Sequence, residues 1–330
     1  MSRARLITAA AGAAVTAAVT AGIAARLVSD RQRKARKLRR GDETPFGSLH
    51  SPRRMVIATD GVALNAEIDE GPQADGPTIV FSHGWMCSLD NWHFQRAALR
   101  GKSRMVFFDH RSHGMSGRSA EANSTVEQLG QDLKSVIDEC APTGEIILVG
   151  HSMGGMTIMS LAAQFPELFH DRIKGVVLCA TGAGQLLRGS SVLRYLRPII
   201  ARTTLLLDAG RSFNSFSVLR RFGLGPHAPE RYVDMTEEMI LRNSSHVLLD
   251  FYPTLLTLDL YEALGNMPAD NVIVIGGEKD LLTPIRHSRQ LAELIEGAHL
   301  IELKDTGHMV MFEEHETVTR AITEVLDAIS

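Results

Sequence analysis

Ser152 stands in a stretch whose residue types and spacing suit a catalytic nucleophile. Residues 146–155 read I-I-L-V-G-H-S-M-G-G, an apolar run followed by the pattern G-x-S-x-G. Small residues two positions before and after the serine allow a sharp turn that presents the hydroxyl between a strand and a helix. A helix-length segment, 153–165, follows and ends before Pro166. This context favours a nucleophilic serine over an ordinary Gly/Ser turn.

A serine hydroxyl is a weak nucleophile near neutral pH, so it needs an imidazole to take its proton and a carboxylate to orient that imidazole. His308 is the best-placed base, because it lies on a loop after the last apolar strand, 301–303. Asp280 is the matching acid, because it follows the apolar run 271–275 in a loop ended by a proline. We therefore predict a triad of Ser152, Asp280 and His308, in this chain order.

Competing assignments are placed less well. Asp280 could instead be a turn or N-cap residue, and Glu278 is a second carboxylate in the same loop. Three other histidines of the C-terminal part fall in or near helices or at the start of a strand, namely His287, His315 and His299.

The segment 83–86, H-G-W-M, follows the first long apolar strand, where backbone N–H groups can stabilise an oxyanion. We assign the oxyanion hole to the amides of Trp85 and Met153. The second follows the nucleophile at a helix N-terminus, where its N–H has no partner within the helix.

The elements that must position these residues alternate along the chain. A hairpin is predicted over residues 55–68, around a turn at 60–61. Short continuous apolar runs, typical of strands buried on both faces, follow at 78–82, 105–108, 146–149, 175–179 and 271–275. Helix-length segments lie between the strands or close the chain, at 89–99, 125–139, 153–165 and 314–329. The alternation predicts an α/β fold, a mostly parallel sheet covered by helices on both faces.

Residues 183–264 interrupt this alternation with a segment that lacks a clear buried strand. We expect a helical cap here, inserted before the strand that carries Asp280. Arginines are frequent within it, and the simplest interpretation of them is a solvated helix surface.

Together these features resemble the α/β-hydrolase superfamily, specifically its single-domain, cap-bearing serine hydrolases. The resemblance covers residues 55–330 and rests on H-G at 83–84, D-H-R-S-H-G-M-S at 109–116, and the segments around Ser152, Asp280 and His308. The chain departs from the family pattern at two loop positions. Ser112 stands where glycine is usual, and Met86 stands where proline is common.

The resemblance implies cleavage of carboxylic esters through an acyl-enzyme on Ser152. Epoxide hydrolases and haloalkane dehalogenases are disfavoured, because members of those groups use aspartate as the nucleophile. The apolar cap, together with a membrane tether, favours lipophilic acyl esters such as monoacylglycerols as substrates.

Three alternatives stay open. A cofactor-free haloperoxidase or perhydrolase would use the same triad. A carbon–carbon bond hydrolase would also use it, although the G-P-G of that group is missing from the H-G-W-M loop. A noncatalytic, membrane-associated binding protein would require an inert triad, although all three members are present.

Residues 6–25 carry no charge and would span about 30 Å as a helix, roughly the thickness of a bilayer core. Basic residues crowd the segment 26–40 that follows. We expect residues 1–40 to form a membrane anchor with the catalytic domain on the cytoplasmic side, and a cleaved signal of a secreted protein is the alternative. Residues 41–52 read as a linker to the catalytic domain, 53–330.

The composition of the 330-residue chain is that of an ordinary globular protein, 44% hydrophobic and 22% charged. A net charge of -3 gives no reason to expect a nucleic-acid partner. Three widely spaced cysteines indicate neither a disulfide framework nor a metal site. We predict no cofactor and no metal, and a small-molecule ester as the partner. The sequence does not indicate the oligomeric state.

Overall fold

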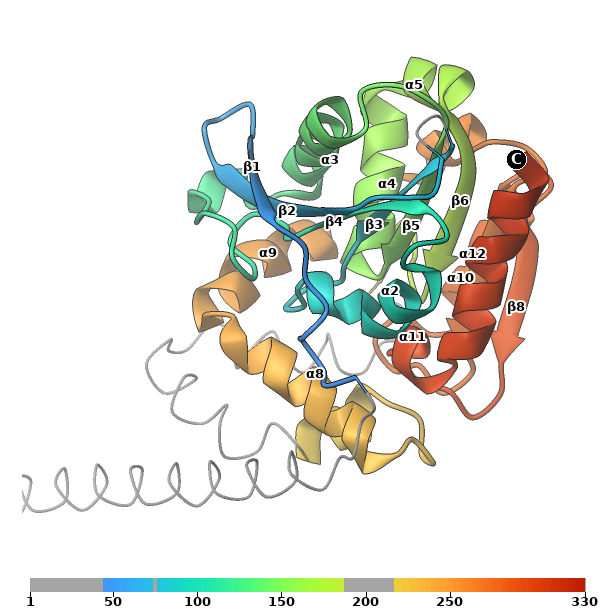
Figure 1. The fold of residues 1–330 in the computed structure, drawn as a ribbon. Coiled ribbons are helices and arrows are strands. Elements are labelled where there is room, and N and C mark those ends of the chain that lie inside the picture. The colour runs from blue at the N-terminus through green and yellow to red at the C-terminus, as the bar shows by residue number, and fades with distance from the viewer. Residues whose placement is uncertain (1–43, 74–75, 187–216, 330) are drawn as a thin grey trace, which may run out of the picture.

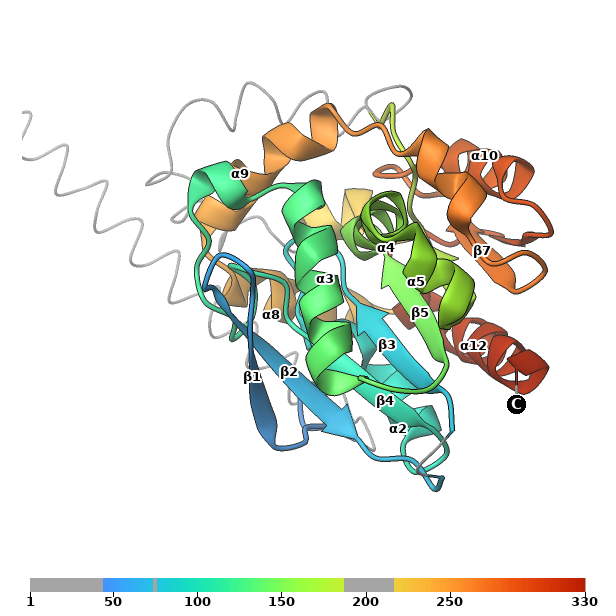
Figure 2. The same cartoon turned by 90° about the horizontal axis from the view of Figure 1, so that it is seen from above.

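The computed structural model describes residues 44–73, 76–186 and 217–329. A single eight-stranded sheet runs through it in the order β1-β2-β4-β3-β5-β6-β7-β8 (Figures 1 and 2). β1 and β2 pair antiparallel, as does β2 with β4, and the other neighbours are parallel. The strands are β1 Arg53–Ile57, β2 Ala63–Asp69, β3 Thr78–Ser82, β4 Arg104–Phe108, β5 Ile146–His151, β6 Ile173–Cys179, β7 Val272–Gly277 and β8 His299–Leu303.

Helices follow most of the strands. The α-helices are α2 His93–Leu99, α3 Val126–Cys140, α4 Met153–Gln164, α5 Pro166–Asp171, α8 Glu230–Arg242, α9 Ser245–Leu256, α10 Arg286–Leu294, α11 Val310–Glu313 and α12 His315–Ile329. The short 3₁₀ helices of the described residues are η1 Leu89–Trp92, η2 Glu121–Asn123 and η3 Tyr261–Asn266. The predicted α/β fold, with its mostly parallel sheet, is confirmed.

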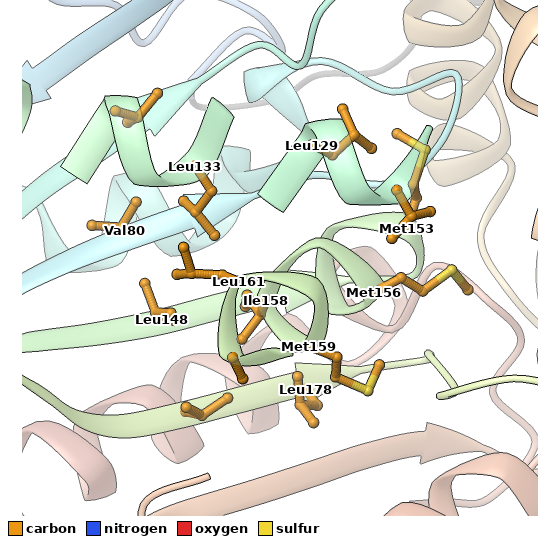
Figure 3. Close-up of a cluster of buried hydrophobic side chains, with 14 of the residues drawn as sticks. Val80, Leu129, Leu133, Leu148, Met153, Met156, Ile158, Met159, Leu161 and Leu178 are labelled. Atoms are coloured by element: carbon orange, nitrogen blue, oxygen red, sulfur yellow. The ribbon is translucent and has the colours of Figure 1, made fainter. Parts of the chain in front are cut away.

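The central strands are continuous apolar runs because both faces of the sheet are covered. In β5, Ile146 and Leu148 pack into one buried cluster, whereas Ile147 and Val149 pack into a second cluster on the opposite face. The first cluster includes apolar side chains of α3 and α4, and the second includes those of α2 and α12. Figure 3 shows part of the first cluster, where Leu133 of α3 points toward Leu161 of α4.

The strands match the predicted runs closely. The hairpin predicted over 55–68 corresponds to β1 and β2, and the predicted helix 89–99 begins as η1 and continues as α2. α3 begins where expected because Thr125 is its N-cap, with the side-chain oxygen accepting the N–H of Gln128 at 3.1 Å.

Between β6 and β7 the described chain contains the helices α8, α9 and η3 in place of a further strand of the sheet. We call α8 and α9 the cap helices. They lie outside the layers formed by the sheet and its flanking helices (Figure 1). Residues 187–216, which belong to the cap predicted over 183–264, lie outside the described residues.

The sequence predicts a membrane-anchored localisation, and this prediction is wrong for the part of the chain that the structure describes. In the ranges that the structure describes, no helix is long and apolar enough to cross a membrane. α3 and α12 have 15 residues each, or about 22 Å of helix, which is short of a hydrocarbon core of about 30 Å. Residues 6–25 and the basic segment 26–40, on which the prediction rested, lie outside the described residues.

Candidate active site

Ser152 forms the turn between β5 and α4 with a backbone conformation that side-chain-bearing residues rarely adopt. Its φ is 51° and its ψ is -116°, a strained combination of the kind found at functional sites. The turn is held by hydrogen bonds from both sides. The Ser152 N–H donates to the Cys179 carbonyl at 2.9 Å, and the Thr181 hydroxyl donates to the Ser152 carbonyl at 2.7 Å.

The glycines on either side of Ser152 are required by close packing. A Cβ on Gly154 would lie 2.0 Å from the carbonyl oxygen of Ser82, at the end of the neighbouring strand β3. A Cβ on Gly150 would lie 2.6 Å from the Ile158 side chain and 2.7 Å from the Gly155 nitrogen. Any side chain at either position would push the turn away from the sheet, so the G-x-S-x-G spacing has a direct steric cause here.

Asp280 and His308 are brought together at the ends of β7 and β8. The Nδ1 of His308 donates to Oδ2 of Asp280 at 2.8 Å, and both side chains are buried. The other carboxylate oxygen, Oδ1, accepts the backbone N–H groups of Leu282 at 2.8 Å and Thr283 at 2.9 Å. These bonds fix the carboxylate, and the carboxylate in turn fixes the imidazole with Nε2 as the nitrogen left to act as a base.

The rival carboxylate Glu278 is exposed, whereas Asp280 is 3% exposed. His287 lies in α10, His299 begins β8 and His315 begins α12, as the sequence suggested. None of these three donates a hydrogen bond to Asp280, whereas His308 does.

A pocket is lined by four of the five predicted site residues, and Asp280 is not among the described residues that line it. Ser152, His308, Trp85 and Met153 all line it. Its remaining walls are mostly apolar, and no Lys, Arg, Asp or Glu is found among the described residues that line it: Cys87, His151, Met156, Leu186, Leu219, Gly223, Thr236, Ile240, Leu255, Leu282, Thr283 and Met309. A neutral, apolar group would therefore be the best fit for this space.

The loop after β3, which we call the β3 loop and define as residues 83–88, faces the Ser152 turn. A Cβ on Gly84 would lie 2.7 Å from Nδ1 of His151, so the loop packs directly against β5. Within the loop, Nδ1 of His83 donates to the Gly84 carbonyl at 2.8 Å. Met153 begins α4, and the first N–H groups of a helix have no partner inside it.

Three buried histidines meet at the start of the β3 loop, His83 of the loop itself and His110 and His113 of the segment after β4. His83, His110 and His113 pack ring against ring, with centroids 4.6 to 6.2 Å apart. Burial lowers the pKa of His83 to about 4 and that of His113 to about 3, and it holds the pKa of His110 well below 6.5. These rings are therefore neutral near pH 7 and act as packing and hydrogen-bonding groups.

Both departures from the family pattern lie at unusual backbone conformations. Ser112 has a φ of 64°, which glycine would adopt without steric cost. Met86 has a φ of 62°, which proline cannot adopt, because its ring fixes φ near -65°. The β3 loop therefore takes a path at Met86 that a chain with proline there could not follow.

Several residues of the site escaped the sequence analysis. His151 donates from Nε2 to the carbonyl of His308 at 3.1 Å, while its Nδ1 faces the amide of Asn91 at 3.4 Å. Burial and the neighbouring His308 hold the pKa of His151 well below 6.5, so the ring stays neutral. Glu313 accepts the N–H of Gly307 at 3.1 Å. No sequence motif signals these contacts, and those of His151 join it to residues 60 and 157 positions away in the sequence.

No group of three or more His, Cys, Asp or Glu residues in the described chain could hold a metal ion. The three cysteines are free and buried. Burial raises the pKa of the Cys87 thiol, which lines the pocket, to about 12.

Comparison with known protein families shows to which family the chain belongs. A family model described as alpha/beta hydrolase fold matches residues 77–315. The chain belongs to the alpha/beta hydrolase family. Hydrolases among its relatives support a hydrolase function for this alpha/beta hydrolase, and the predicted resemblance to the superfamily is confirmed.

Individual relatives of this alpha/beta hydrolase are distant. It is 27% identical to the dihydrolipoyllysine-residue acetyltransferase component of the acetoin cleaving system of Pseudomonas putida, over 88% of this chain and 83% of that protein. It is 25% identical to 3-oxoadipate enol-lactonase 2 of Acinetobacter baylyi, over 77% of this chain and 90% of that protein. Among solved structures, the enol-lactonase of Burkholderia xenovorans LB400 superposes with a TM-score of 0.66, at 24% identity over 83% of this chain and 100% of that one.

Proposed function

We propose that this hydrolase cleaves carboxylic esters of neutral, apolar acyl groups through an acyl-enzyme on Ser152. One observation carries the proposal. Ser152, held on a strained turn, lines the same apolar pocket as His308, whose ring is fixed by Asp280 at 2.8 Å. The domain that does this chemistry is 53–330, with its cap at about 183–264.

The reaction follows from these groups. Ser152 Oγ attacks the ester carbonyl carbon and gives its proton to Nε2 of His308, while Asp280 stabilises the imidazolium through Nδ1–H. The N–H groups of Trp85 and Met153 bind the carbonyl oxygen as it becomes an oxyanion. Collapse expels the alcohol, which takes the proton from His308. Water, deprotonated by the same imidazole, then hydrolyses the acyl-enzyme and releases the acid.

The names of the relatives support acyl chemistry of this kind. An acetyltransferase moves an acyl group, and an enol-lactonase opens a cyclic ester. The pocket supports a different acyl group from that of an oxoadipate lactone, which carries a free carboxylate. The described pocket residues offer no Lys or Arg to pair with such a charge.

A panel of p-nitrophenyl esters tests the proposal. We expect the purified protein to hydrolyse the neutral valerate ester with a kcat/KM at least about 10-fold above that for the hemisuccinate, which has nearly the same length but carries a carboxylate. Ser152→Ala should lower kcat by about 1,000-fold or more. Equal activity of Ser152→Ala and wild type would sink the mechanism, and preference for the hemisuccinate would sink the substrate class.

A further inference from the structure

The turn between the cap helices α8 and α9 is tied to the β3 loop by a buried side chain. Asn243, which directly follows α8, is 5% exposed. Its Nδ2 donates to the carbonyl oxygens of Met86 at 2.7 Å and Cys87 at 3.1 Å. Its Oδ1 accepts the N–H of Gly114 at 3.0 Å. One amide thus connects the cap to two loops of the α/β body.

Asn243 Nδ2 also donates to the Met239 carbonyl within α8 at 3.3 Å, and its two partners in the β3 loop directly follow Trp85. Met86 has a φ of 62°, a left-handed conformation that is strained for a methionine and needs support from its surroundings. The amide of Asn243 supplies that support, because it fixes the direction of the Met86 carbonyl and so the path of the loop. This is also the position where the chain departs from the proline common in its family.

A second set of contacts joins the same two parts of the molecule. The indole N–H of Trp85 donates to the carbonyl of Val247, in α9, at 3.1 Å. The ring of Trp85 stacks on that of Tyr252, also in α9, with centroids 6.3 Å apart and planes 26° apart. The residue that carries the proposed oxyanion donor is therefore held by the cap on its side-chain side, while Asn243 holds the backbone that follows it.

We propose that Asn243 is a positioning residue, which holds the β3 loop so that the Trp85 N–H points to the oxyanion of the reaction. This inference rests on the proposed function, because it assigns a purpose to the loop only if Ser152 forms a tetrahedral intermediate. It makes the cap part of the catalytic apparatus as well as a wall of the pocket. Oxyanion donors act through exact placement, so a small shift of the loop lowers the rate more than it lowers binding of the ground state.

Asn243→Asp is the sharpest variant. It keeps the size of the side chain and an oxygen for the N–H of Gly114, and it replaces the donor to the Met86 and Cys87 carbonyls by a carboxylate oxygen that repels them. Asn266→Asp is the matched control. Asn266 donates from Nδ2 to the Ala162 carbonyl at 3.0 Å, and it is exposed and not among the described residues that line the pocket.

The measurements are kcat and KM for p-nitrophenyl valerate, and the inhibition constant of a trifluoromethyl ketone of the same chain length, which adds to Ser152 and places an oxyanion in the hole. We expect Asn243→Asp to lower kcat by about 10- to 100-fold with KM within about 3-fold of wild type, and to weaken the ketone by a similar factor to the loss in kcat. Asn266→Asp should match wild type in all three. If Asn243 acted only on stability, Asn243→Asp would lower the melting temperature and would change the inhibition constant of the ketone by no more than it changes KM.

Asn243→Ser, which keeps a hydroxyl donor and adds no charge, decides the case if Asn243→Asp does not fold, and we expect an intermediate loss of kcat from it. Wild-type kcat and ketone affinity in the folded Asn243 variant would overturn this inference alone. If the wild type does not hydrolyse the ester, or if Ser152→Ala keeps wild-type activity, the proposed function is overturned and this inference with it.

Discussion

Gly154 is the residue at which the geometry of the site is least tolerant. A Cβ there would lie 2.0 Å from the Ser82 carbonyl oxygen, well inside any real contact distance. Ser82 ends β3 and leads directly into the β3 loop. A methyl group at Gly154 would therefore disturb the nucleophile turn and the proposed oxyanion donor together.

We expect Gly154→Ala to lower the free energy of unfolding by about 2 kcal/mol or more, because the backbone must shift to admit the methyl group. Activity should also fall under conditions in which the variant remains folded. Gly265→Ala is the control, since a Cβ on that exposed glycine would meet nothing within 4 Å. Urea unfolding of both variants checks the expectation, and equal stability of the two would contradict the steric account.

The types of residue that we propose to do chemistry could be singled out from the sequence because few side chains can serve. A serine between glycines, an aspartate after a buried strand and a histidine on the last loop are restrictive combinations, and the structure places Asp280 and His308 in direct contact. Asn243 was not open to prediction. Asparagine is ordinary after a helix, and its partner, the Met86 carbonyl, lies 157 positions away in the sequence.

At the scale of elements, the short helix α11 joins the loop that carries His308 to the chain leading into the cap helices. Its last residue, Glu313, accepts the N–H of Gly225 at 2.7 Å and that of Gly307 at 3.1 Å. Burial raises the pKa of Glu313 to about 7, while these two backbone hydrogen bonds oppose the rise. The nearby Asp280 raises this pKa further, and His308 lowers it.

This shift predicts a pH-dependent stability. The folded-state pKa of Glu313 lies above the ordinary value of 4.5, so its stabilising contribution is fully present below pH 4.5 and is lost as the pH rises through about 7. We expect the free energy of unfolding of wild type, relative to Glu313→Gln, to fall by up to about 3 kcal/mol between pH 4.5 and 8. Chemical unfolding at both pH values measures this. The exposed Glu316→Gln is the control, and a wild-type advantage that is constant with pH would contradict the prediction.

The strands and flanking helices were predictable because burial on both faces leaves a local signature, a continuous apolar run such as Thr78–Ser82, all five residues of which are buried. The arrangement of the cap helices was not. α8 and α9 are amphipathic or mixed segments whose direction depends on contacts such as that of Trp85 with Val247, which join residues distant in the sequence. Periodicity indicates that such helices exist and not where they pack.

At the scale of the whole molecule, the parallel sheet explains how distant segments meet. β5, β6, β7 and β8 are consecutive neighbours that run in the same direction, so the residues following them gather at one edge. Ser152 follows β5, Asp280 follows β7 and His308 follows β8. The cap helices lie over this edge and contribute Thr236, Ile240 and Leu255 to the pocket. The fold thus determines where these residues lie, and the loops carry the side chains proposed to do the chemistry.

The most direct test of the central claim is covalent labelling of the full chain with a fluorophosphonate, followed by mass spectrometry of the modified peptide. Our account predicts a single adduct on Ser152, no labelling of Ser152→Ala, and labelling slowed by about 100-fold or more in His308→Ala, since the serine then lacks its base. An adduct on another residue, or labelling of Ser152→Ala at the wild-type rate, would contradict it.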